Sequence, residues 1–306
     1  MNNKICIHKY LTKCKTTELP PGLGDFLRGT ISLLIFSKIY NYTFFIDKSI
    51  HPFFSYFKDS KYYIHDENNN NNDNVIELLP CNGSWEEIYK NINNLFNLNE
   101  SFSIITNSFY SINTNGFLEN YGTIPDDIQL IMRDILQPTD KVEEKIDEVF
   151  KNIYKIDKDD KYKVIHLRIG DDKLIFNKSF EHEFYSNYYN RIMNYINNNE
   201  DVTYILITDS IQMGMLLLQD IPKLLYWNNH KIHIGGLHNY AQLIQEQQGD
   251  SNIFSGSTQT ENNIDNELFD TVVDFIIISR CSEIISNNSG FSLINSCIYN
   301  IKYTTI

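Results

Sequence analysis

Residues 162–173 read YKVIHLRIGDDK, and the expected fold is built outward from this stretch. Val164, Ile165 and Leu167 form a short apolar run rich in β-branched side chains, which is typical of a buried strand in an α/β sheet. Arg168 follows directly, and after it come a glycine and two carboxylates. Open α/β sheets bind ligands outside the carboxyl ends of their strands, so this stretch predicts a ligand site.

The guanidinium of Arg168 is well suited to hold an anion. It can bind a phosphate through two parallel N–H donors, which the ammonium of a lysine cannot do. An ordinary ion pair between Arg168 and Asp171 or Asp172 explains the same pattern. Both interpretations stay open on this stretch alone.

Composition limits the class of protein. At 306 residues, with 42% hydrophobic and 13% aromatic residues, the chain is long and apolar enough for two domains. A net charge of −13 disfavours nucleic acid as the main partner, because binders of its phosphate backbone are usually basic. Five scattered cysteines without a C-x-x-C pair indicate neither a zinc site nor a disulfide framework. With no signal-peptide or membrane-spanning run, we expect a cytoplasmic protein without a membrane span.

The N-terminal half begins as a Rossmann-like unit. The expected elements are a strand at residues 5–8, a glycine loop at 20–25 (PPGLGD), a buried helix at 26–40 and a strand at 43–47 (TFFID). Backbone N–H groups of this loop can approach an anion at the helix start, although a plain tight turn explains the glycines as well. Further on, the pattern predicts helices at 85–96, 125–136 and 140–153 and a strand at 101–106.

The charged segment 156–161 (IDKDDK) is the expected domain boundary, and it divides the chain into residues 1–156 and 157–306. Asp140 and Glu143 predict a capping box shortly before it. Beyond it the α/β alternation returns. The expected strands lie at 202–208, 224–227, 231–234 and 283–286, the helices at 184–196, 213–218, 268–280 and from 291, and a polar loop at 248–266.

Small residues at 287–290 (NNSG) join the last expected strand to the last helix. Hydroxyl and glycine residues at such a junction suit an anion, although a Ser or Asn helix cap gives the same pattern. Three anion-suited loops therefore follow, at 22–25, 168–171 and 288–292. Two Rossmann-like domains facing each other would bring all three to one cleft and accommodate a diphosphate.

This order of motifs resembles the fucosyltransferase superfamily with the GT-B fold, which includes α1,2-, α1,6- and protein O-fucosyltransferases. The resemblance rests on GLGDFLRG (22–29), HLRIGD (166–171) and DFIIISRCSEIISNNSGFS (274–292), and it runs through most of the chain as short islands. It implies an α/β, GT-B fold with two Rossmann-like domains facing each other across a cleft. Residues 1–156 would be the acceptor-side domain and residues 157–306 the nucleotide-sugar-binding domain.

The resemblance also implies an inverting, metal-independent transferase that moves fucose from GDP-fucose to a glycan or protein hydroxyl. Arg168 matches the arginine that contacts the donor's β-phosphate, His166 the histidine beside the nucleotide, and Asp274 the aspartate that hydrogen-bonds guanine. The other matches are the residues of the glycine loop and the phosphate-binding serine turn: Gly22, Gly24, Ser289, Gly290, Phe291 and Ser292.

Two departures from the family concern catalysis. Many relatives carry a second arginine where this chain has Ile169, so some charge for the donor phosphates is missing or comes from Arg28 or Lys173. The acceptor-side carboxylate of some relatives has no aligned match, and Phe176 stands close to its position.

The catalytic candidates divide by role. Arg168 would stabilise charge on the leaving diphosphate, while Asp25, Asp171 or Asp172 would deprotonate the acceptor. Asp171 is alternatively the residue that holds Arg168 in place.

A metal is not expected. Asp157-Lys158-Asp159 has D-x-D spacing but lies in a charged linker, and His230, His233 and His238 lack a carboxylate pattern. The alternative functions are a GDP-sugar-binding protein without turnover and a GT-B transferase that uses another nucleotide sugar.

Overall fold

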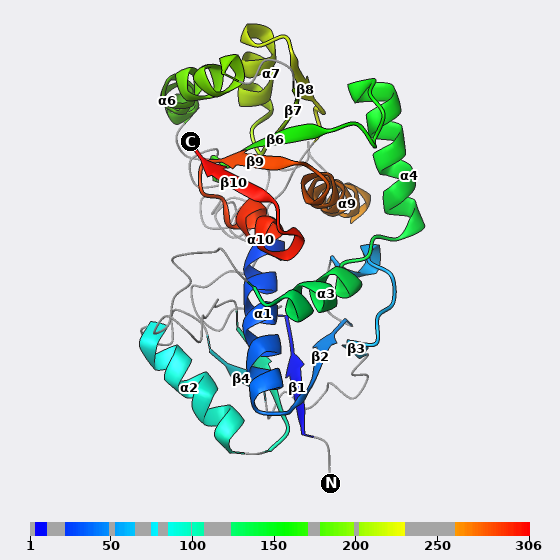
Figure 1. The fold of residues 1–306 in the computed structure, drawn as a ribbon, viewed down its shortest axis with the longest axis vertical. Coiled ribbons are helices and arrows are strands. Elements are labelled where there is room, and N and C mark those ends of the chain that lie inside the picture. The colour runs from blue at the N-terminus through cyan, green and yellow to red at the C-terminus, as the bar shows by residue number, and fades with distance from the viewer. Residues whose placement is uncertain are drawn as a thin grey trace, which may run out of the picture. The chain divides into compact units, whose positions relative to one another are not determined.

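The computed structural model describes residues 4–10, 22–48, 53–64, 75–78, 85–98, 100–106, 124–170, 178–198, 202–229 and 261–306. The chain divides into two compact units, Met1–Gln137 (unit 1) and Pro138–Ile306 (unit 2). Each unit contains a five-stranded sheet whose paired strands are all parallel (Figure 1). This confirms the expected α/β class with two Rossmann-like domains. The division lies before the charged segment that marked the expected boundary after residue 156, so the helix at residue 140 groups with unit 2.

The sheet of unit 1 has the strand order β3-β2-β1-β5-β4. Its elements in chain order are β1 (Ile5–His8), α1 (Leu23–Ile39), β2 (Thr43–Asp47), the short 3₁₀ helix η1 (Phe54–Tyr56), β3 (Tyr63–Ile64), β4 (Val75–Glu77), α2 (Trp85–Asn97), β5 (Phe102–Ile105) and α3 (Asp126–Ile135).

Helix α1 packs closely against the sheet of unit 1, and most of its residues are buried. This burial agrees with a sequence that is apolar on most sides of the helix. Gly29 permits this approach, since a Cβ atom there would lie 2.1 Å from the carbonyl oxygen of Thr106, just after β5. Any larger residue would push the helix away from the end of the sheet.

A neutral histidine, His8, ties the end of β1 to α1. Its ring stacks on Phe26 with the ring centroids 4.1 Å apart. Its Nε2 lies 2.9 Å from the Thr106 carbonyl oxygen and its Nδ1 3.0 Å from the Thr30 hydroxyl oxygen. Because a carbonyl only accepts, Nε2 carries the proton. Burial lowers the pKa of His8 to about 3, so the ring stays neutral.

The sheet of unit 2 has the order β10-β9-β6-β7-β8. Its elements are α4 (Asp140–Glu148), the π-helix η4 (Val149–Tyr154), β6 (Tyr162–Leu167), α6 (Lys178–Asn197), β7 (Thr203–Thr208), α7 (Ile211–Asp220), β8 (Leu224–Tyr226), α9 (Glu261–Ser279), β9 (Glu283–Ser286), α10 (Gly290–Tyr299) and β10 (Lys302–Thr305).

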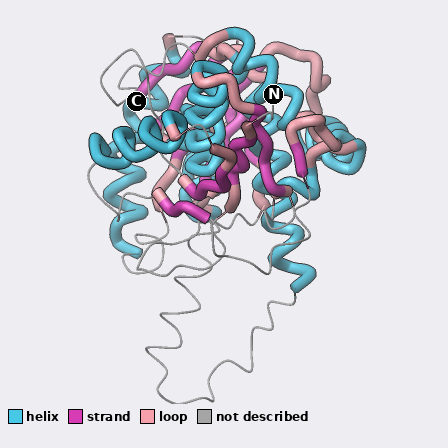
Figure 2. Tube along the Cα trace, turned by 90° about the horizontal axis from the view of Figure 1, so that it is seen from below, coloured by secondary structure: helices cyan, strands magenta, loops and turns pink. Residues whose placement is uncertain are grey.

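Strand β6 lies at the centre of this sheet between β9 and β7. Helices α6 and α7 pack on one face and α9 and α10 on the other (Figure 1). Figure 2 shows the helices and strands of the chain coloured by type. Both faces of β6 are covered, which explains its nearly continuous apolar sequence.

The structure corrects several expected details. Thr139 precedes α4 and no side chain caps it, so the capping box of Asp140 and Glu143 is wrong. The polar loop expected over 248–266 is wrong from Glu261 on, where α9 begins. Strands β3, β4 and β10 were not expected. The strand expected at 231–234 lies outside the described residues. Within the described ranges, no helix has both the length and the apolar character needed to cross a membrane.

The histidine on β1 predicts a pH dependence of stability. Its pKa in the folded chain, about 3, lies below the ordinary value of 6.5, so on acidification the unfolded chain binds the proton first. The stabilisation is complete above pH 6.5 and is lost as the pH falls toward 3. Urea unfolding measures the free energy of unfolding at each pH. Between pH 6 and 4, this free energy should fall by up to about 1.4 kcal/mol more per pH unit in wild type than in His8→Phe. Parallel curves for the two proteins would contradict the assignment.

Candidate functional site

Three parallel strands of unit 2 end at one level. Strand β6 pairs with β9 in a register that places His166 opposite Ser286, and with β7 in one that places Leu167 opposite Thr208. The next residues along the three strands are therefore neighbours, and one of them is Arg168. The candidate site is built at this carboxyl edge.

Asn287 holds the backbone of Arg168 from the β9 side. The backbone N–H of Arg168 donates to the Asn287 Oδ1 at 2.9 Å, and the Asn287 Nδ2 donates back to the Arg168 carbonyl oxygen at 2.7 Å. A side-chain amide offers a donor and an acceptor side by side. It continues the strand pairing by one residue past the end of β6.

Asp209 holds the same loop from the β7 side. Its Oδ2 lies 2.9 Å from Nη1 of Arg168, and its two oxygens accept the backbone N–H groups of Ile169 at 2.8 Å and Gly170 at 3.0 Å. Arg168 thus forms an ion pair, as one interpretation of the sequence expected, but its partner is Asp209 on the neighbouring strand's end. Asp171 and Asp172 lie outside the described residues.

Ile169 occupies the position at which the resemblance expected a second arginine. Its side chain is buried at 7% exposure in the core cluster beneath α6 and α7, together with Leu167 and Met213. The position therefore faces the core, and an apolar residue there stabilises the sheet instead of carrying charge to the site. Gly170 follows with φ of 96°, a conformation that side chains rarely adopt.

The turn from β9 to α10 lies beside this loop. Asn288 adopts a left-handed φ of 64°, Ser289 precedes the helix without a side-chain cap, and Gly290 is the first helical residue. The Ser292 hydroxyl is fully buried and contacts Ser286 Oγ at 3.1 Å and the Ser289 carbonyl oxygen at 3.2 Å. The side chain of Ser292 is thus turned inward. The N–H groups of the first turn are what the helix offers an anion.

Aromatic contacts connect this edge to α9. The Phe291 ring lies 5.7 Å from that of His166 and 5.3 Å from that of Phe275, measured between centroids. Phe275 follows Asp274, whose carboxylate is buried at 3% exposure. His166, Phe291 and Asp274, three residues that the resemblance assigns to nucleotide binding, therefore belong to one set of packed elements.

The carboxylate of Asp274 is buried within unit 2. Arg280, six residues further along the chain, has its Nη2 2.6 Å from a carboxylate oxygen of Glu143 on α4. Burial, and after it the Asp274 charge, raise the pKa of Tyr226 to about 12 and that of Tyr154 well above its ordinary value. Asp274 is thus a buried carboxylate near two tyrosines, a costly arrangement for a charge.

The candidates of unit 1 lie at the start of α1. Gly22 precedes the helix in an extended conformation, so the glycine stretch is the helix start itself, with Gly24 as its second residue. Asp25 Oδ1 lies 3.1 Å from Nη1 of Arg28, and this neighbouring carboxylate offsets the charge of Arg28. Lys173 lies outside the described residues. Of the three expected anion loops, the structure brings two together within unit 2.

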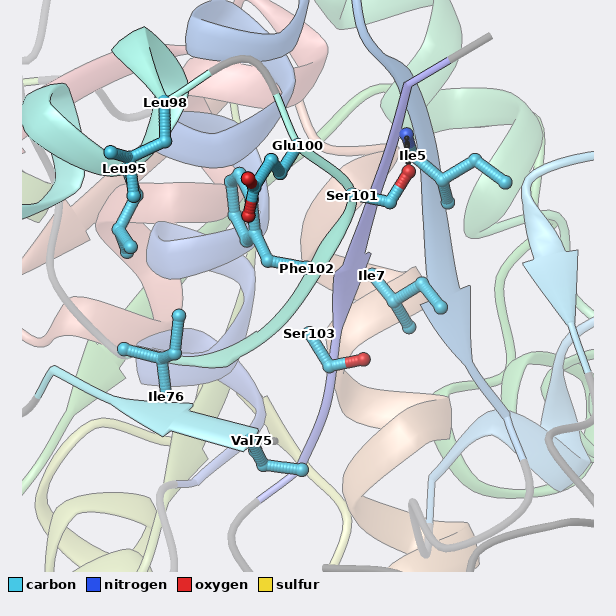
Figure 3. A pocket seen from close by; sticks show the side chains of 10 residues that line it. All are labelled: Ile5, Ile7, Val75, Ile76, Leu95, Leu98, Glu100, Ser101, Phe102 and Ser103. Atoms are coloured by element: carbon cyan, nitrogen blue, oxygen red, sulfur yellow. Dashed lines mark hydrogen bonds between the residues drawn. The ribbon is translucent and has the colours of Figure 1, made fainter. Parts of the chain in front are cut away.

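Two alternatives to this edge are a metal site and a cavity in unit 1. Among the described side chains, no group of three or more His, Cys, Asp or Glu could hold a metal. Asp157 and Asp159 belong to a turn in which the Asp157 carboxylate accepts the Asp159 N–H at 3.0 Å. A cavity of about 630 Å³ in unit 1 is lined mainly by apolar residues, and Glu100 gives it the wrong charge for phosphate (Figure 3).

Two parallel α/β units in one chain form the architecture of the GT-B glycosyltransferases, and solved members of that class share this fold. The NodZ α-1,6-fucosyltransferase co-crystallised with GDP matches with a TM-score of 0.55 at 14% identity, over 96% of this chain and 92% of that chain. NodZ from Bradyrhizobium matches with 0.53 at 14%, over 96% and 92%. POFUT1 in complex with GDP-fucose matches with 0.51 at 9%, over 99% and 98%. No protein-family model and no curated protein sequence matches the chain.

Proposed function

We propose that this protein is an inverting fucosyltransferase that takes fucose from GDP-fucose and transfers it to a hydroxyl acceptor. The observation that carries the proposal is the Arg168 loop beside the start of α10, held at the carboxyl edge of a parallel sheet. A guanidinium and the free N–H groups of a helix start are two anion-binding devices at one place. The fold shared with fucosyltransferases that were crystallised with GDP or GDP-fucose supports it.

The donor roles follow from the chemistry of each group. Arg168 and the turn at Ser289, Gly290, Phe291 and Ser292 would receive the diphosphate, the turn through its backbone N–H groups. His166 would lie beside the nucleotide. Asp274 would accept from the two adjacent N–H donors of guanine, which compensates the cost of burying its charge. Gly22 and Gly24 would bring α1's first N–H groups to the pyrophosphate.

The reaction breaks a sugar–phosphate bond, and charge develops on the leaving diphosphate. Fixed donors aimed at that charge lower the barrier because they need no reorganisation as the bond breaks. A carboxylate must take the proton of the acceptor hydroxyl. Asp25, 42% exposed on α1, and Asp171 are the proposed candidates. The reaction as proposed uses no metal.

A second candidate function is GDP-sugar binding without turnover. Ile169 faces the core and Asp209 offsets the charge of Arg168, so this site carries less positive charge than one with two arginines. Both functions predict GDP binding, and only the transferase releases GDP. A GT-B transferase that uses another nucleotide sugar would bind a different donor preferentially.

Turnover tests the proposal directly. The assay offers a panel of glycan, glycolipid and peptide acceptors in the presence of excess EDTA, which removes metal ions. Under these conditions the protein should release GDP from GDP-fucose faster than it releases the nucleotide from GDP-mannose or UDP-galactose. Loss of activity in EDTA with recovery in Mn²⁺ would contradict metal independence. GDP binding without release on any acceptor favours the binding protein.

Arg168→Ala should weaken GDP binding, or slow transfer, by about 2–4 kcal/mol because a charge-assisted diphosphate contact is removed. Arg168→Lys should retain more GDP affinity than Arg168→Ala but less than wild type, since an ammonium lacks the paired, coplanar N–H donors of a guanidinium. Calorimetric titration with GDP measures both. Arg280→Ala, which removes a guanidinium paired with Glu143 in the same unit, is the matched control and should bind GDP as wild type does. Equal GDP affinity in Arg168→Ala would end the assignment.

Asp274→Asn should weaken GDP binding by about 1–3 kcal/mol, because it presents an amide donor where guanine needs two acceptors. Binding of UDP, which has no guanine, should stay as weak as in wild type. Titrations with both nucleotides measure the contrast, and melting temperatures report folding. Asp147→Asn, an exposed partner of Lys158 on α4, is the control. Unchanged GDP affinity, or a variant that unfolds, would make Asp274 a structural residue.

A further inference from the structure

We propose that Asp209 is a positioning residue of the donor site, one that holds the Arg168 guanidinium and the Ile169–Gly170 backbone in the orientation that receives the diphosphate. The inference rests on the proposed function and extends it to a residue outside the resemblance to known transferases. Asp209 acts through Arg168 and is not itself placed against the donor.

The bonds of Asp209 define this role. Its Oδ1 accepts the N–H of Ile169, and its Oδ2 accepts both the N–H of Gly170 and Nη1 of Arg168. A plain ion pair would need only the last of these contacts. Two successive backbone N–H groups converging on one carboxylate fix the path of the loop as well as the direction of the guanidinium.

Asp209 is itself rigidly held. It follows β7 directly, and its side chain is only 9% exposed. The next residue, Ser210, caps α7 by accepting the Met213 N–H at 3.0 Å, and its own N–H donates to the Thr208 hydroxyl at 3.3 Å. The carboxylate is therefore fixed between the end of a central strand and the start of a helix. A group held in this way can transmit its position to the loop it binds.

The loop at residues 168–170 has few other contacts that fix its backbone among the described residues. Asn287 holds only residue 168, through its N–H and carbonyl groups. Gly170 adopts φ of 96°, and among the described residues beyond its chain neighbours no atom lies within 4 Å of where its Cβ would be. Among the described contacts, those of Asp209 are what fixes the backbone of residues 169 and 170.

The occupied oxygens of Asp209 argue against a role as the catalytic base. Three donors already point at them, and a base must be free to accept the acceptor's proton. The same contacts make an amide a poor substitute. Asn at this position keeps one acceptor but turns its NH₂ toward either a backbone N–H or the guanidinium, so two donors would face each other.

The test uses the ratio of GDP to GMP affinity, because GMP lacks the β-phosphate assigned to Arg168. Asp209→Asn should weaken GDP binding by about 10- to 100-fold and GMP binding far less, so the ratio falls. Arg168→Ala should lower the ratio as well. In the double variant the ratio should fall no further than in Arg168→Ala, because Asp209 acts through that side chain.

The control is Glu143→Gln, which breaks the Arg280–Glu143 pair in the same unit and should leave the ratio unchanged. If Asp209→Asn does not fold, Asp209→Glu keeps the charge, displaces it by one methylene and should lower the ratio less steeply. A ratio that stays constant or rises in the folded Asp209 variants overturns the inference, and so does an additive loss in the double variant. A wild type that binds GDP no more tightly than GMP overturns the proposed function and the inference with it.

Discussion

The parallel pairing of β6 with β9 and β7 is the constraint on which the site depends. Hydrogen bonds between these strands align Leu167 with Thr208 and His166 with Ser286. Parallel strands in register end together, so the residues that follow must share one edge whatever their separation in sequence. A slip of one residue would turn Ile169 out of the core and Arg168 into it. The buried apolar side chains of β6 therefore fix the position of the charged loop.

Charge at this edge is balanced before any ligand arrives. Asp209 offsets Arg168, and the whole chain carries −13. For the diphosphate proposed above, oriented dipoles would therefore matter more than net charge. The first-turn N–H groups of α10 supply a fixed partial positive charge, and the guanidinium, held in place by Asp209, supplies direction. Such a site gains from pre-organisation what it lacks in charge.

The sequence predicted those strands whose apolar runs are long, such as β6 and β7, because burial on both faces leaves a pattern that single residues do not disturb. Strands β3 and β10 escaped prediction for the opposite reason. Tyr63–Ile64 is only two residues long, and Lys302–Thr305 carries a lysine and two threonines at the edge of its sheet. Edge strands of this kind are defined by the neighbour they pair with, which local sequence does not specify.

The site shows the same division between local and non-local information. Arg168 was recognisable because a guanidinium directly after a buried strand is a local pattern. Its partner was sought among the adjacent carboxylates, whereas the structure supplies Asp209 from the next strand of the sheet. Knowing that β6 and β7 are parallel neighbours would have sufficed, since the first residue after each strand then meets the other. Packing likewise explains why Ile169 stands where a second arginine was considered. Successive side chains along an extended chain point in opposite directions, so the residue next to Arg168 points away from the site. Ile169 accordingly lies in the core cluster.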